Sequence, residues 1–201
     1  MTDFATLKSD VALYMARSDL DTTIPTFVRL CESRIRKTVR IPEMETTEDL
    51  TLTAQTVALP AGFIAMRRIY SDSTTDRPLE YQPPEICWSD ASFTTPGAPI
   101  AYTIEGTNLS VFPYAANYVA KINYWKAFNA LSGDADTNWL LTNAYDVYLY
   151  GTLMEAKAFI EDDAQVQKWT AAFETAVTAL NEAGKRQRRG PVLRKMGVTA
   201  P

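Results

Sequence analysis

The sequence predicts an α+β protein: a helical bundle of two N-terminal and two C-terminal helices, an inserted small antiparallel β domain, and an extended basic C-terminal arm. Three observations support this prediction. Apolar residues recur at helical spacing up to about residue 42 and again from about residue 137. Between these segments the helical period gives way to short runs rich in Thr, Val and aromatic residues, separated by turn residues. The last residues are strongly basic.

Residues 1–42 predict the N-terminal helices of the bundle. The first helix should cover residues 2–17, with an apolar stripe formed by Phe4, Leu7, Val11, Tyr14 and Met15. The second should begin near Thr23, with Pro25 in its first turn, and end at Ile41, because Pro42 cannot continue a helix without cost. Its apolar stripe should consist of Phe27, Leu30, Cys31, Ile35 and Thr38.

Residues 43–131 predict the inserted β domain. Turn residues separate short segments of strand composition, at 47–53, 56–59, 63–70, 78–81, 100–104, 109–112 and 118–125. The last strand alternates clearly and should place Tyr118, Ala120, Ile122 and Tyr124 on one face. One or two helical turns should run from Pro83 to about Trp88.

Residues 132–184 predict the C-terminal helices of the bundle. A helix from about Asn143 to Glu161 should turn Tyr145, Leu149, Thr152, Leu153, Ala156, Phe159 and Ile160 inward. The last helix should follow Asp162-Asp163, carry Val166, Trp169, Phe173, Val177 and Leu180, and end before Gly184. Because no stripe can be buried alone, helices from both ends of the chain should pack together.

Composition excludes several classes of enzyme. The chain has no histidine, so Ser-His-Asp and Cys-His sites are excluded, and the commonest zinc ligand is missing. The two cysteines, Cys31 and Cys87, are most simply two buried thiols. No apolar run reaches the roughly 20 residues that a membrane span needs. The residues after Met1 do not have the pattern of a signal peptide, so synthesis in the cytoplasm is expected.

The remaining candidate sites have simpler structural interpretations. Asp134 and Asp136 lack the glycine, spacing and glutamate of a calcium loop. The acidic residues 161–163 suit helix capping better than paired-carboxylate catalysis. The aromatic residues of the β region and of residues 139–150 have few basic residues between them, so packing is favoured over base stacking. We therefore predict no catalytic residue, no cofactor and no metal site.

Charge is distributed unevenly along the chain. The net charge is −4, yet the last residues contribute six positive charges, so the preceding residues carry −10. Such an end is expected to bind an anionic partner, although a solvated tail is an alternative. Alternating apolar residues favour a docking arm over residues 185–201. The residues predicted to dock are Lys185, Arg186, Arg188, Arg189, Val192, Leu193, Arg194, Lys195 and Met196.

An ordered set of motifs resembles the head-to-tail adaptor (connector or neck) proteins of tailed bacteriophages. A strand ending in Asn123-Tyr124-Trp125 precedes the Leu131-Ser132 turn, and Thr137-Asn138-Trp139-Leu140-Leu141 leads into a helix. That helix carries Tyr148-Leu149-Tyr150-Gly151 and then Glu155-Ala156. Asp162 stands seven residues before Trp169, and Gly184-Lys185-Arg186 leads into the basic tail. The resemblance is strongest over residues 121–189. It departs from the family's pattern at residues 143–146, where a proline is expected before Asp146.

The resemblance implies a non-enzymatic structural protein of the virion, located in the neck at the portal vertex. The family forms a ring of about twelve copies that joins the portal to the tail and lines the channel for DNA ejection. Its partners would be the portal protein, tail, nozzle or tail-fibre-attachment proteins, and the DNA passing through the lumen, with no membrane. The basic arm would then dock on the portal.

Two other functions remain possible from the residues. A nucleic-acid-binding module that uses the basic arm would bind with an affinity that falls steeply with salt. A small carboxylate enzyme would need a deep pocket that holds Asp or Glu with a shifted pKa. The acidic charge of the preceding residues disfavours the first, and the absence of histidine disfavours the second.

Overall fold

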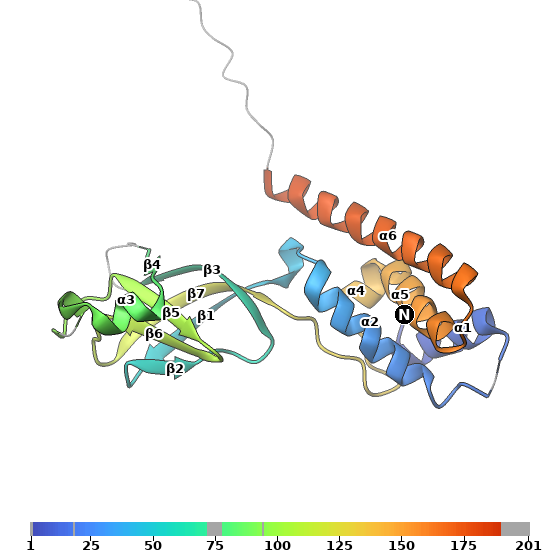
Figure 1. Cartoon of the computed structure of the whole chain (residues 1–201), viewed down its shortest axis with the longest axis horizontal. Helices are drawn as coiled ribbons and strands as arrows, with labels where there is room; N and C mark the ends of the chain where they lie inside the picture. Colours follow the sequence, from blue (N-terminus) through green and yellow to red (C-terminus); the bar gives the residue numbers. More distant parts are fainter. Residues whose placement is uncertain (1, 18, 72–77, 94, 190–201) are drawn as a thin grey trace, which may run out of the picture. The chain divides into compact units, whose positions relative to one another are not determined.

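The computed structural model describes residues 2–17, 19–71, 78–93 and 95–189, and the chain divides into two compact units (Figure 1). The helical unit comprises residues 1–43 and 128–201, so both ends of the chain contribute to it. The β unit comprises residues 44–127. The predicted α+β class is confirmed.

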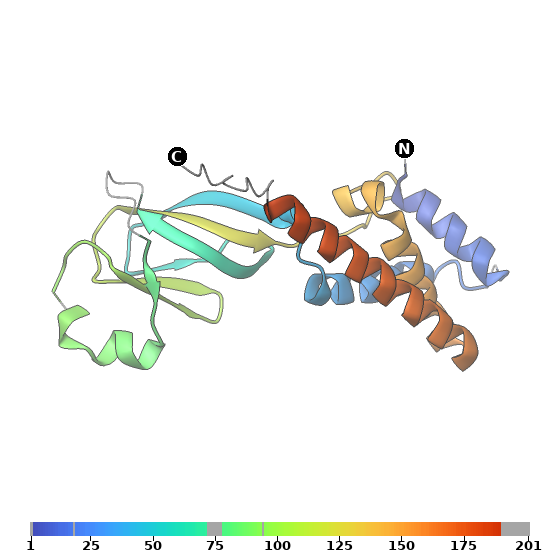
Figure 2. The same ribbon diagram turned by 90° about the horizontal axis from the view of Figure 1, so that it is seen from above.

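The helical unit is organised around one central helix, α5 (Tyr145–Phe159), which begins directly after the short helix α4 (Trp139–Asn143). Helix α5 contacts α1 (Phe4–Met15), α2 (Ile24–Thr38), α4 and the long helix α6 (Asp163–Arg189). Figures 1 and 2 both show α6 lying along α5. Because neighbours surround α5, most of its residues are buried, and apolar side chains fill several of its faces.

The bounds of the second and third predicted helices show how a proline and a helix break limit helices in the structure. Helix α2 ends at Thr38, and not at Ile41, because residues 39–41 leave the helix and bury the side chains of Val39 and Ile41. The residue before a proline disfavours the helical conformation, which limits how far the helix can extend. The helix predicted over residues 143–161 corresponds to α5, which begins two residues later, after the buried residue Ala144 that separates it from α4.

Most predicted stripe residues are buried, but a few lie at the surface. Phe27, Cys31 and Ile35 are buried on α2, whereas Leu30 is 47% exposed and Thr38 is also exposed. Phe159, at the end of α5, is 59% exposed although its ring lies 5.4 Å from that of Phe27. These exceptions lie at the edges of the apolar stripes, where the neighbouring helices no longer cover them.

The β unit contains two sheets. One has the strand order β1–β7–β3, and the other has the order β2–β6–β5–β4. The strands are β1 (Glu45–Leu52), β2 (Thr56–Ala58), β3 (Phe63–Ser71), β4 (Glu80–Tyr81), β5 (Ala101–Glu105), β6 (Asn108–Phe112) and β7 (Tyr118–Lys126). All strand pairs in the sheets are antiparallel except β4 and β5, which are parallel. Helix α3 (Pro84–Ser89) connects these two strands, and two 3-10 turns span Pro42–Met44 and Ala91–Phe93.

The core of the β unit lies on one face of β7. Ala120, Ile122 and Tyr124 are fully buried, as their alternation predicts. Ile122 pairs with Ile69 of β3, and the cluster includes Leu109 of β6, so both sheets contribute to one core. The hydroxyl of Tyr124 donates a hydrogen bond to Glu48 Oε2 at 2.8 Å, and burial together with this carboxylate raises its pKa to about 12.

Candidate functional site

The basic end of α6 is the first candidate site. Helix α6 continues through Gly184 to Arg189, so the first residues of the predicted extended arm form the last turns of a helix. Lys185, Arg186 and Arg188 are exposed there, and Lys185 Nζ lies 2.6 Å from Glu182 Oε1. Of the other predicted docking residues, Arg189 ends the helix, whereas Val192, Leu193, Arg194, Lys195 and Met196 lie outside the described residues.

Gly184 is a packing residue rather than a helix cap. A Cβ at this position would lie 2.9 Å from Pro42 Cδ and 3.3 Å from Ile41 Cα, so only glycine allows this approach without a shift. One turn earlier, Asn181 accepts a hydrogen bond from the Arg40 N–H at 2.8 Å and donates one to the Thr38 carbonyl at 3.0 Å. These contacts fix α6 to the end of α2 and set where the basic turns begin.

A second close approach lies at the centre of the helical unit. A Cβ on Gly151 of α5 would lie 2.4 Å from Cys31 Sγ on α2 and 3.0 Å from the ring of Phe173 on α6. The glycine of the Tyr148-Leu149-Tyr150-Gly151 motif therefore allows three helices to meet. Burial raises the pKa of the Cys31 thiol, so this cysteine is a packing residue and not a nucleophile.

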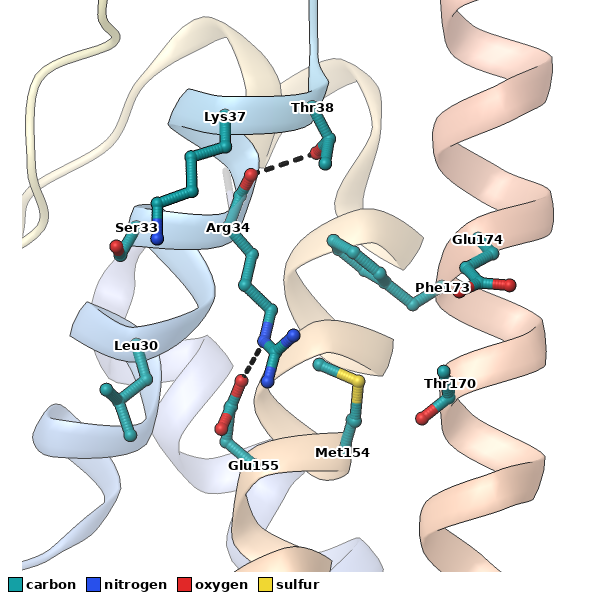
Figure 3. Close-up of a pocket in the computed structure, with 10 residues that line it drawn as sticks. All are labelled: Leu30, Ser33, Arg34, Lys37, Thr38, Met154, Glu155, Thr170, Phe173 and Glu174. Carbon is teal, nitrogen blue, oxygen red and sulfur yellow. Dashed lines mark hydrogen bonds and ion pairs between the residues drawn. The ribbon is translucent and has the colours of Figure 1, made fainter.

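Helices α2, α5 and α6 border a pocket of about 420 Å³, the α2–α6 groove (Figure 3). The buried side chains of Met154 and Phe173 form its floor. The exposed side chains of Leu30 and Lys37 line it on α2, and Glu174 lines it on α6. The groove is thus apolar inside and charged at its edges.

An ion pair crosses the groove. Arg34 Nε donates to Glu155 Oε1, and Figure 3 shows the Arg34 side chain extending from α2 toward α5. The groove was not predicted from the sequence. The only feature of the sequence that indicates the groove is the position of Leu30 between Arg29 and Arg34, where the apolar stripe of the helix borders a basic face.

A polar cluster joins α2 to the segment that enters α4. Glu32 Oε1 accepts a hydrogen bond from the Leu131 N–H at 2.9 Å and lies 3.3 Å from the hydroxyl of Tyr148. Asn138 Nδ2 donates to that hydroxyl at 2.8 Å, and Asn138 Oδ1 caps α4 by accepting from the Leu141 N–H at 2.9 Å. Burial raises the pKa of Glu32 above that of an ordinary glutamate. The Glu32 carboxylate has a structural role here, because this cluster contains no second acid with which it could form a catalytic pair.

The acidic residues considered for chemistry have structural roles. Asp162 accepts from the Gln165 N–H at 3.4 Å at the start of α6 and lies 3.7 Å from Lys157 Nζ. Asp136 accepts from the N–H groups of Ser132 and Gly133, which lower its pKa. Among the described residues, no group of three or more His, Cys, Asp and Glu side chains could hold a metal ion. In the same part of the chain, no helix is long and apolar enough to span a membrane.

The aromatic residues pack against one another. The ring of Trp139 stacks on that of Phe128 at 6.2 Å, Tyr150 lies 5.6 Å from Trp169, and Tyr148 is buried. This arrangement agrees with the predicted packing role, and the ring of Trp139, which is 36% exposed, is stacked on Phe128.

The comparison with protein families identifies a match to a family of phage adaptors. Residues 2–195 match the family model described as SU10 adaptor protein, which covers both units and most of the basic C-terminal segment. A comparison with curated proteins found no match. The family match confirms the resemblance to phage head-to-tail adaptors that the motifs of residues 121–189 indicated.

Proposed function

Because the chain belongs to the SU10 adaptor protein family, we propose that it is a head-to-tail adaptor that forms a ring between the portal and the tail of a tailed phage. The observation that carries this proposal is the family match, which extends over residues 2–195. The protein is a structural component of the virion, and its work is binding rather than catalysis. In the neck it would contact the portal on one side and tail, nozzle or tail-fibre-attachment proteins on the other.

The basic end of α6 would dock on the portal. Lys185, Arg186 and Arg188 are exposed within about one helical turn, and the packing at Gly184 holds their backbone in a defined position. A preorganised set of cations loses little conformational entropy on binding. Guanidinium groups can bind carboxylates through two hydrogen bonds each, so an acidic groove on the portal is a suitable partner. The remaining docking residues, Arg189 and those from Val192 to Met196, would extend this contact.

The ring would surround the DNA channel. About twelve copies joined by the same head-to-tail contact would close by rotation around the portal axis. The residues before Lys185 carry a net charge of −10, so most of the chain repels phosphate groups. A wall of this charge would let DNA pass through the lumen without retaining it.

Reversing charges on the basic turns tests the portal contact. Arg186→Glu with Arg188→Glu should strongly reduce co-sedimentation with the purified portal of the same phage, because attraction to an acidic groove becomes repulsion. Arg17→Glu is the matched control, since Arg17 is an exposed residue of the helical unit whose ion pair with Asp19 contributes little to stability. Unchanged portal binding by the double variant would reject the role of the arm. Binding of DNA that falls steeply with salt would instead favour the nucleic-acid-binding alternative.

A further inference from the structure

Helix α3 of the β unit and its surroundings combine exposed apolar side chains with acidic charge. Ile86 and Trp88 are 46% and 52% exposed. Glu85, Asp90 and Glu105 are exposed beside them, and we call these five residues the α3 surface. The sequence from residue 78 to residue 120 contains four acidic residues and no Lys or Arg. This surface is therefore apolar and strictly anionic, which suits a partner that is apolar and cationic.

Trp88 is held in place despite its exposure. Its indole N–H donates to Glu105 Oε1 at 2.6 Å, and its ring contacts the buried ring of Phe112 edge-on at 4.9 Å. Tryptophan side chains fixed in this way are frequent anchors of protein interfaces, because they bury a large area without first losing conformational freedom.

The α2–α6 groove of the helical unit has the complementary properties. Its floor is apolar, and Leu30 at its edge is 47% exposed. Helix α2 carries four basic residues and one acidic residue, and that acidic residue, Glu32, is turned to the polar cluster with Leu131 and Tyr148. Lys37 lines the groove and is exposed, and Arg29, which directly precedes Leu30, is exposed as well. A pocket of about 420 Å³ is large enough to receive an indole ring.

We propose that the α3 surface of one copy docks into the α2–α6 groove of the next copy. This inference rests on the proposed ring and identifies the contact between its subunits. Trp88 covers Leu30 and the apolar floor, while Glu85, three residues before Trp88 on α3, and Asp90 face Arg29 and Lys37. The two surfaces are different and belong to different units, so the contact is heterologous, and repetition around an axis closes a ring.

A charge swap between two variants tests this contact directly. Lys37→Glu alone should place glutamates on both surfaces, and Glu85→Lys alone should place lysines on both. Each should weaken assembly on the portal by at least about tenfold, because the attraction becomes a repulsion. An equimolar mixture of the two should recover assembly, because alternating copies restore an opposite pair at every contact. Native mass spectrometry of adaptor and portal from the same phage counts the copies bound, and the two variants should appear in equal numbers.

The controls are Arg17→Glu and Asp21→Lys, which reverse exposed charges of the helical unit outside the groove and should assemble normally. Leu30→Ser should also weaken assembly, whereas Leu13→Ser, at an exposed position of α1, should not. Full occupancy by either single variant, or no recovery in the mixture, would overturn the proposed subunit contact while leaving portal binding intact. Failure of the unmodified chain to bind the portal at all would overturn the ring proposal together with it.

Discussion

Gly151→Ala is expected to destabilise the helical unit by up to about 2 kcal/mol. The new Cβ would lie 2.4 Å from Cys31 Sγ, a separation that requires α2 or α5 to shift. Overpacking of this kind costs about 1–3 kcal/mol, and the better helix propensity of alanine offsets about 1 kcal/mol of that loss. Glycine within a helix is normally unfavourable. A net loss of stability on replacing Gly151 with alanine would therefore show that close packing requires glycine at this position.

Urea unfolding followed by far-ultraviolet circular dichroism measures this change. Ala171→Gly, at an exposed position of α6, gives the helix-propensity contribution in the same protein. Cys31→Ala removes the atom nearest to the new methyl group, so Gly151→Ala should cost at least about 1 kcal/mol less in that background. If Gly151→Ala raises stability, or costs the same with and without Cys31, the three helices do not meet as closely as described.

Two further predictions concern the helical unit. Gly184→Ala places a Cβ 2.9 Å from Pro42 Cδ, so it should lower the free energy of unfolding by about 1 kcal/mol and weaken co-sedimentation with the portal. A variant with undiminished stability and portal binding would contradict this close approach. Burial raises the folded-state pKa of Glu32, so its contribution to stability is greatest below the unfolded pKa and is lost as pH rises through the folded pKa. The free energy of unfolding in urea should be measured for Glu32→Gln and for the unmodified chain. As pH rises from about 4 to 7, the unmodified chain should lose stability relative to Glu32→Gln, and a difference that does not depend on pH would refute this.

Local sequence patterns predicted most helices and strands, because burial imposes a period on the apolar residues. The helical period correctly predicts burial of Phe4, Leu7 and Val11 on α1. The two-residue period of a strand correctly predicts burial of Ala120 and Ile122 on β7. The parallel pairing of β4 with β5 was missed, because neighbouring short strands usually form hairpins, whereas here α3 provides the crossover.

The candidate site depended more strongly on tertiary structure. Gly184 has the same sequence signature as a helix cap, and only the proximity of Pro42 shows that it allows the helix to continue. Leu30 belongs to the apolar stripe by spacing, but it lies at the edge of the α2–α6 groove because α6 does not cover it. The basic residues of the arm were identified from composition alone, since clustered charge needs no fold to be recognised.

The mass of the complex between this protein and the portal of the same phage tests the central claim most directly. Light scattering should be measured for the adaptor alone, the portal alone and their mixture. The proposed function predicts a defined particle in which the portal gains the mass of about twelve adaptor copies. A mixture in which the portal keeps its own mass and the adaptor remains separate would contradict the adaptor function.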